Sequence, residues 1–329
     1  MTSSTSSSSN APPLGKFLAS TDKATRDSAI KGLGFFLSEP ENAHMAEQDM
    51  AKLWKGIFYC FWMSDKPLVQ QALASELAEV MLNINPVSSA LNFLEGFWQC
   101  MVREWNGIDR LRVDKYYMLI RRYVNASFRL LMRAGWSLGT IDEYNKILVR
   151  QGGPLCPTHT RVPPSLAYHL CDIYLEELEK VLADLSNQNA TPPSVPLGRL
   201  LDPFLTLAAR TTANPTVRRI ISVVLEPLIE SLQYPQYAES LGHKRRQVLD
   251  QDLSVLVDHA CLFDPETEGR LDRVSLHRGI VKHIFDTACD HNSRDSNRRK
   301  MYSFWKQHAL ELEDQEAAPL SRTRVSDPS

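Results

Sequence analysis

The sequence predicts an all-α protein, an α-solenoid or HEAT-like array of about a dozen helices. From Leu14 onward apolar residues recur three and four positions apart, and the strict alternation typical of strands is rare. Consecutive helices would pair as antiparallel hairpins of roughly 40 residues, within the size range of HEAT-type repeats. No strict sequence repeat supports this period, so a compact all-α bundle is the alternative.

Periodicity defines the individual helices, in chain order. They are expected near residues 22–38, 46–63, 67–84, 87–105, 109–134, 141–151, 164–184, 198–210, 215–232, 245–262, 274–290 and 294–313.

Capping and proline signals support several of these boundaries. Asn85-Pro86 and Asn214-Pro215 each place a capping side chain before a proline at the first helical position. Thr140 with Glu143 fits a capping box. Pro227 lies inside an apolar helical run and should kink it.

Composition divides the chain into a helical domain and two polar ends. Residues 2–9 are serine or threonine throughout, so a disordered N-terminus is expected over 1–13. A single helical repeat-like domain is expected over 14–313, with an internal linker near 186–196 and a short polar tail over 314–329. No secretory signal and no bilayer-spanning run is evident, which predicts no membrane association.

Charge and glycine content exclude several classes of protein. The 329 residues include 37 basic and 39 acidic side chains, a net charge of −2, whereas domains built only to grip nucleic acid are strongly basic. Glycine is scarce, at 14 residues, and no phosphate-loop or dinucleotide-binding motif occurs. The six cysteines form no CxxC pair and are expected to be reduced and buried. We expect no cofactor and no small-molecule substrate.

One group of polar residues near the C-terminal end of the chain could suggest metal-dependent catalysis. Asp286, Cys289, Asp290 and His291, with His283 one turn before, could suggest a metal site, but zinc ligands usually come as spaced pairs from two elements. A buried cysteine at a helix end with solvated neighbours explains this group better.

Further polar groups lie in the middle of the chain. Cys156, His159 and His169 could suggest a thiol nucleophile, although nothing in their spacing supplies the geometry. The neighbouring acidic run is expected to be a solvated helix face rather than a catalytic pair; it comprises Asp172, Glu176, Glu177 and Glu179.

The most informative charged feature is the helix over 109–134. Residues 103–133 include eight basic and three acidic side chains, a balance of +5. Lys115, Arg122, Arg129 and Arg133 fall within about 40° of one another on a helix, and Arg121 is a further candidate contact of the same helix. This basic stripe is either a solvated face balanced by acidic neighbours such as the 172–184 helix, or a contact for RNA phosphates or an acidic partner.

Two shorter basic patches follow, and each is a candidate RNA or partner contact. The first comprises Lys244, Arg245 and Arg246; the second comprises Arg294, Arg298, Arg299 and Lys300. The aromatic residues of the first half, from Trp54 to Tyr123, recur at helical spacing and are expected mostly in the core.

Four segments resemble a known family. They read KLWKGIFYCFWMSDKP (52–67), DKYYMLIRR (114–122), HLCDIYLEEL (169–178) and LDPF (201–204). Together, and in this order, they are similar to the ribosomal RNA-processing protein 1 family, also called the nucleolar protein fifty-two family. The similarity extends from about Lys16 to Leu232 and weakens toward Leu310.

The resemblance implies a non-enzymatic nucleolar protein of the nucleus that assembles the large (60S) ribosomal subunit precursor and is needed for pre-rRNA processing. Its implied partners are other assembly factors and pre-rRNA within pre-60S particles, to which it would bind as a helical scaffold. A direct RNA-binding module using the basic face of helix 109–134 is the main alternative. A metal-dependent nuclease around Asp286 and Cys289 is the remaining one.

Overall fold

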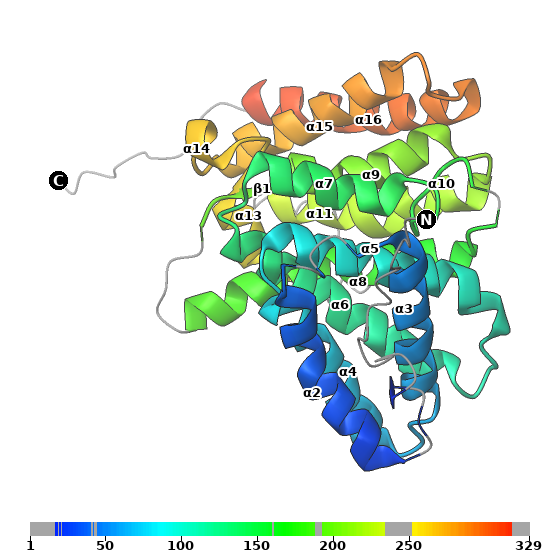
Figure 1. Ribbon diagram of the computed structural model, residues 1–329. Helices are drawn as coiled ribbons and strands as arrows, with labels where there is room; N and C mark the ends of the chain where they lie inside the picture. The colour runs from blue at the N-terminus through cyan, green and yellow to red at the C-terminus, as the bar shows by residue number, and fades with distance from the viewer. Residues whose placement is uncertain are drawn as a thin grey trace, which may run out of the picture. The chain divides into compact units, whose positions relative to one another are not determined.

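The computed structural model describes residues 17–18, 20, 22–40, 42, 45–159, 161–187, 193–233 and 252–317. The all-α prediction is confirmed, because these residues are almost entirely helical (Figure 1). They form two compact units, Met1–Pro193 and Ser194–Ser329. The expected disordered N-terminus, most of the expected C-terminal tail and the Lys244–Arg246 patch lie outside the described residues.

The N-terminal unit is a two-layered helical array. Its elements are α2 (Lys23–Ser38), α3 (Glu47–Trp62), α4 (Pro67–Asn83), α5 (Val87–Glu104), a 3-10 turn (Trp105–Gly107), α6 (Val113–Arg133), α7 (Leu138–Val149) and α8 (Pro164–Asn187). In one layer α2 packs on α4, α4 on α6 and α6 on α8; in the other, α3 packs on α5 and α5 on α7. Stacking of alternate helices is the arrangement of a helical repeat array.

Aromatic side chains from both layers form the core of this unit. Trp54 lies against Phe93 and Phe97, and its indole nitrogen donates to the Phe93 carbonyl at 2.9 Å. Tyr123 stacks on Phe97 with ring centroids 4.0 Å apart. Gly96 permits this packing, since a Cβ there would overlap the Trp54 ring. Most of the aromatic residues of the first half are therefore buried, as predicted.

The C-terminal unit is built around a helical hairpin. Its elements are β1 (Val195–Pro196), α9 (Leu197–Arg210), α10 (Asn214–Ile220), a π-helical segment (Ile221–Leu225), α11 (Glu226–Leu232), α13 (Ser254–His259), β2 (Ala260–Cys261), α14 (Pro265–Glu268), α15 (Arg273–Cys289) and α16 (Asp295–Ala317). Helices α15 and α16 lie side by side, and both contact α9 (Figure 1). Asn297 fixes the start of α16 to the end of α9, donating to the Thr211 carbonyl at 2.8 Å.

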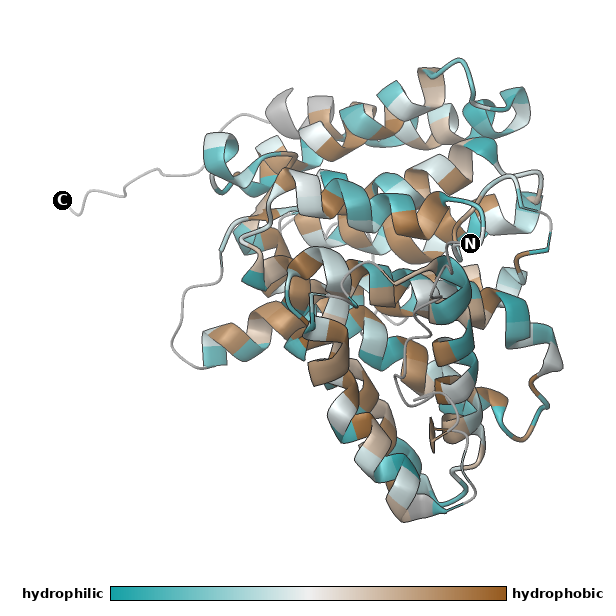
Figure 2. Cartoon of the chain, in the orientation of Figure 1, coloured by the Kyte–Doolittle hydropathy of each residue, from teal (hydrophilic) through white to brown (hydrophobic). Residues whose placement is uncertain are grey.

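Amphipathic helices account for both units. Figure 2 shows hydrophobic and hydrophilic residues on the same long helices, as expected where one face is buried. No helix in the described part of the chain is long and apolar enough to cross a membrane.

Three local predictions were wrong. The helix expected to begin near 141 begins at Leu138 after Ser137, so Thr140 and Glu143 form no capping box, and Glu143 pairs with Lys146 instead. The two asparagine caps are misplaced by one residue, because Pro86 and Ala213 occupy the N-cap positions.

Two further differences concern the C-terminal unit. The helix expected over 245–262 ends at His259 in the described residues, and Ala260–Cys261 pairs in parallel with Val195–Pro196 as a two-residue strand. The 215–232 helix is divided by a π-helical segment that ends just before Pro227. Because proline has no backbone N–H, the regular hydrogen-bond ladder cannot continue through it.

Candidate functional site

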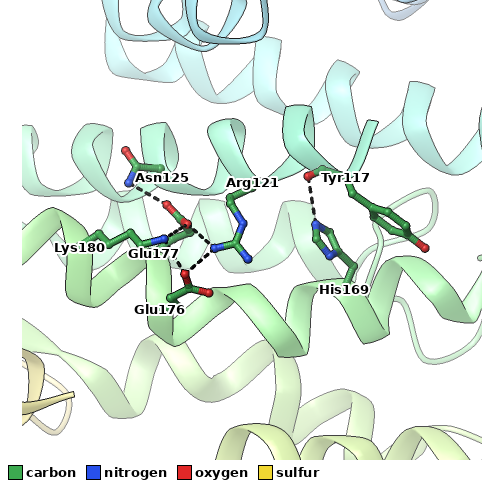
Figure 3. A network of polar contacts seen from close by, with 7 residues as sticks. All are labelled: Tyr117, Arg121, Asn125, His169, Glu176, Glu177 and Lys180. Carbon is green, nitrogen blue, oxygen red and sulfur yellow. Dashed lines mark hydrogen bonds and ion pairs between the residues drawn. The ribbon is translucent and has the colours of Figure 1, made fainter. Parts of the chain in front are cut away.

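A charged network joins the basic helix α6 to α8 (Figure 3). The Arg121 guanidinium lies 2.7 Å from a carboxylate oxygen of Glu176 and 2.8 Å from one of Glu177. Lys180 contacts both carboxylates, at 2.5 and 3.0 Å, and the Asn125 amide donates to Glu177 at 3.0 Å. Arg121 is therefore engaged with the acidic helix that the sequence suggested as its neighbour.

The two carboxylates of this network differ in burial. Glu177 is buried, with only 4% of its surface exposed, whereas Glu176 is half-buried. Burial alone would raise the pKa of Glu176, but hydrogen bonds from Arg121 and Lys180 outweigh it and lower that pKa. Glu176 thus carries a negative charge that Arg121 and Lys180 compensate.

Lys115 points into the N-terminal unit. It is buried, and its ammonium donates to the carbonyls of Phe61, Trp62 and Ser64 at 3.0, 2.7 and 2.8 Å. Burial lowers the pKa of Lys115 to about 8, with a smaller contribution from Arg112. The side chain stabilises the C-terminus of α3, where carbonyls lack helical partners.

Two further residues of the stripe, both on α6, contact α4. Arg133 donates to the Leu82 carbonyl in the last turn of α4, and Arg129 forms an ion pair with Glu79. Arg122 differs from both, because it is exposed and makes no hydrogen bond or ion pair with another residue in the described ranges. Among the residues that the structure describes, Arg122 is therefore the one unpaired cation of the stripe, and its neighbours are engaged within the protein.

The basic patch of the C-terminal unit also contains both cations with partners inside the protein and an exposed cation. Arg298 donates to the carbonyls of Ala288, Asp290 and Ser293 at 3.0–3.3 Å and so satisfies the end of α15. Lys300 donates to the Asn214 side chain. Arg299 is exposed and unpaired among the residues that the structure describes.

A ring cluster missed in the sequence lies beside Arg299. The rings of Phe285, Tyr302 and Trp305 are in mutual contact, with centroids 4.6–6.2 Å apart. Tyr302 is 46% exposed, and Phe285 and Trp305 are half-buried. The only sequence signal for the group is the spacing of Arg299, Tyr302 and Lys306, which places a cation one turn on either side of an aromatic ring.

The residues considered for a metal site are engaged in other contacts. His283 bonds to Asp202 at 2.7 Å, and Asp286 pairs with Lys282 at 2.6 Å. Cys289 is exposed, which corrects the expectation that it is buried. Within the described part of the chain no group of three or more His, Cys, Asp or Glu residues is placed to hold a metal ion.

The residues considered for a thiol nucleophile belong to separate contacts. Cys156 lies 3.6 Å from the Thr158 hydroxyl. His169 bonds through Nε2 to the Tyr117 carbonyl at 3.1 Å and packs on the Tyr117 ring (Figure 3). Burial lowers the pKa of His169. These contacts place His169 in the packing of α6 against α8.

Comparison with known proteins matches most of the chain. The family described as "Nucleolar protein, Nop52" matches residues 9–261. A Homo sapiens relative, Ribosomal RNA processing protein 1 homolog B, is 35% identical over 284 residues, covering 84% of this chain and 34% of the relative. Homo sapiens homolog A is 34% identical over 326 residues, covering 88% of this chain and 68% of the relative. A Drosophila melanogaster homolog is 30% identical over 201 residues.

The fold defines an all-α helical repeat protein whose polar networks mainly join helices and satisfy helix ends. The chain belongs to the Nop52 nucleolar protein family. This confirms the resemblance carried by the four sequence segments. The chain spans about a third of the length of homolog B.

Proposed function

We propose that the chain acts in ribosomal RNA processing as a non-enzymatic assembly factor of the nucleolus. The observation that supports this most strongly is the family match over residues 9–261, together with relatives named for ribosomal RNA processing. In this proposal the chain assembles the large (60S) subunit precursor, and its partners are other assembly factors and pre-rRNA within pre-60S particles.

A scaffold role agrees with how the charged residues are used. Lys115, Arg121, Arg133 and Arg298 all contact carbonyls or carboxylates of their own unit. Such contacts hold helices in fixed positions and leave fewer cations for general binding to phosphate. Stacked helices expose many turns and helix faces at once, which suits binding to several partners.

Affinity purification from cells tests this proposal. A tagged chain is isolated in moderate salt, and the bound RNAs and proteins are identified before and after nuclease treatment. We expect large-subunit precursor RNA together with assembly factors, and we expect the proteins to remain bound after nuclease and in raised salt. Recovery of small-subunit precursors alone, or of neither RNA nor assembly factors, would refute the proposal.

Direct RNA binding through α6 is the second candidate, and the unpaired Arg122 favours it. It requires that Arg122→Glu with Arg129→Glu abolishes RNA binding and reduces its salt dependence. The matched control is Lys31→Glu with Lys52→Glu, which also reverses one exposed cation without a partner among the described residues and one cation paired with a carboxylate. Equal RNA affinity in the two double variants would exclude this candidate.

A further inference from the structure

We propose that the α15–α16 hairpin carries a stacking platform for single-stranded RNA. The platform consists of the Phe285, Tyr302 and Trp305 rings with the cations Arg299 and Lys306. This inference deepens the proposed function, on which it rests, by assigning an RNA contact to a surface of the C-terminal unit.

The three rings meet the first requirement of such a platform. Their centroids are 4.6 Å (Phe285–Trp305), 5.1 Å (Tyr302–Trp305) and 6.2 Å (Phe285–Tyr302) apart. An aromatic cluster that served only the core would be covered, as Trp54 and Phe97 are in the N-terminal unit. Here Tyr302 leaves 46% of its surface in solvent, and the other two rings are only half-buried. Every base has a π-face, so exposed rings bind bases without sequence preference.

Two unpaired cations meet the second requirement. Arg299 precedes Tyr302 by three residues and Lys306 follows it by four, so both lie on its face of α16. Both are exposed, and neither forms a hydrogen bond or ion pair with another residue described by the structure. Lys115 and Arg298, in contrast, donate hydrogen bonds to backbone carbonyls. Cations left in water beside exposed rings are placed to contact phosphates while bases stack.

The charge of the hairpin favours an anionic partner. Residues 273–311 contain eight basic and four acidic side chains, a balance of +4, within a chain of net charge −2. All four acids are engaged: Asp286 pairs with Lys282, Asp290 with Arg210 and Asp295 with Arg298, and Glu311 bonds to His308. The sequence becomes acidic only beyond the platform, from Glu311 onward. The RNA is therefore expected along the N-terminal half of α16.

Stacking separates single-stranded RNA from other anions. In a duplex the base faces are already stacked, so rings on a helix surface cannot reach them. An acidic peptide would use the cations but would gain little from the rings. The chemistry of the platform therefore matches unpaired nucleotides best.

Fluorescence anisotropy with the purified full chain tests the proposal. The probes are a labelled 12-nucleotide oligouridine, a labelled RNA duplex of the same length and a labelled poly-glutamate peptide, each titrated at several salt concentrations. We expect the oligouridine to bind more tightly than the duplex and the peptide. A chain that binds no single-stranded RNA, or prefers the duplex, would overturn the platform.

Two variants distinguish the contribution of ring stacking to RNA binding from that of the cations. Tyr302→Leu keeps an apolar side chain and should weaken oligouridine binding about 5-fold or more with an unchanged salt slope. Its control is Tyr59→Leu, because Tyr59 has a similar exposure of 41% on α3.

Arg299→Gln with Lys306→Gln should reduce the salt slope by about 1.4, near 0.7 for each single-strand phosphate contact. Its control is Lys31→Gln with Arg218→Gln, two other exposed unpaired cations in the described residues.

Each remaining outcome has one meaning. Equal affinities of the Tyr302→Leu and Tyr59→Leu variants for oligouridine would overturn the proposal that bases stack on the platform. Poly-glutamate binding as tight as RNA and indifferent to Tyr302 would assign the surface to an acidic protein and overturn the RNA proposal. Circular dichroism and thermal unfolding confirm that each variant is folded. The proposed function fails separately: a wild-type chain that enters large-subunit precursors but binds no oligouridine refutes only the platform.

Discussion

Individual cations in this protein often bind the carbonyls at helix ends. Lys115 does so at the end of α3, Arg133 at the end of α4 and Arg298 at the end of α15. The last carbonyls of a helix lack intrahelical donors and carry partial negative charge. A cation there therefore supplies the missing hydrogen-bond donors and also compensates the negative charge. Part of what the sequence shows as basic stripes is therefore structural.

Replacing Lys115 should be costly. Lys115→Met removes the donor to three carbonyls at a buried position, and each unsatisfied buried group costs about 1–3 kcal/mol. We expect the free energy of unfolding in urea to fall by about 3 kcal/mol or more. Arg122→Met, on the exposed side of the same helix, should change it by no more than about 0.5 kcal/mol. Similar values for the two variants would contradict the capping role.

His277 should make stability depend on pH. It is buried, its Nε2 has no hydrogen-bond partner in the described residues, and burial followed by the neighbouring His308 lowers its pKa to about 4. The unfolded pKa is about 6.5, so the unfolded state binds more protons between these values. The free energy of unfolding should fall by about 3 kcal/mol as the pH decreases from 6.5 to 4.

Urea titrations at several pH values check this expectation. The neighbours facing His277 include the His308–Glu311 pair, joined at 2.7 Å, and Glu311 partly opposes the decrease in the pKa of His277. His277→Leu removes the buried imidazole and should flatten the dependence over this pH range. An equally steep dependence in the variant would assign the effect to other groups.

At the scale of elements, the α6–α8 contact depends on a buried charge. Glu177 is satisfied by Arg121, Lys180 and Asn125, whereas the exposed Asp49–Lys52 pair has no such enclosure. Removing one partner of a buried pair leaves an uncompensated charge, and exposed pairs contribute about 0–1 kcal/mol.

A double-mutant cycle tests this difference. Arg121→Met with Glu177→Gln should show a coupling energy of about 1–3 kcal/mol, because Glu177 is desolvated. The matched cycle, Lys52→Met with Asp49→Asn, should give less than about 0.5 kcal/mol. Equal coupling in both cycles would mean that burial adds nothing to the network.

For the whole molecule, the two compact units each have their own buried residues. The N-terminal unit buries Trp54, Phe97 and Tyr123, and the C-terminal unit buries Phe204 and Ile280. A chain of nearly two hundred residues buries enough surface to fold alone. We therefore propose that the units are independent domains, in place of the single domain expected from the sequence.

Expression of residues 1–193 tests this division. The fragment should be helical by circular dichroism and unfold cooperatively. Within it, Gly96→Ala should cost about 1–3 kcal/mol, because the added Cβ overlaps Trp54. A fragment without a cooperative transition would show that the division at Pro193 does not separate domains.

The sequence by itself determined the class and the family. Helical periodicity is a local property of neighbouring residues, so it predicted most helices within a few positions. The segments 52–67 and 114–122 carried the family, because their order of residue types is long and specific. The start of the helix after Ser137 and the capping residue at Pro86 were less well predicted, since several adjacent residues could cap each helix.

Tertiary structure alone decided which charged residues face water. Lys115 and Arg122 share one helical stripe, yet the first reaches the end of α3, more than fifty residues earlier in the chain, and the second remains exposed. Phe285 joins Tyr302 and Trp305 only because α15 and α16 pack together. Burial and pairing depend on which segments meet in space, and helical periodicity within one segment carries no information about that meeting.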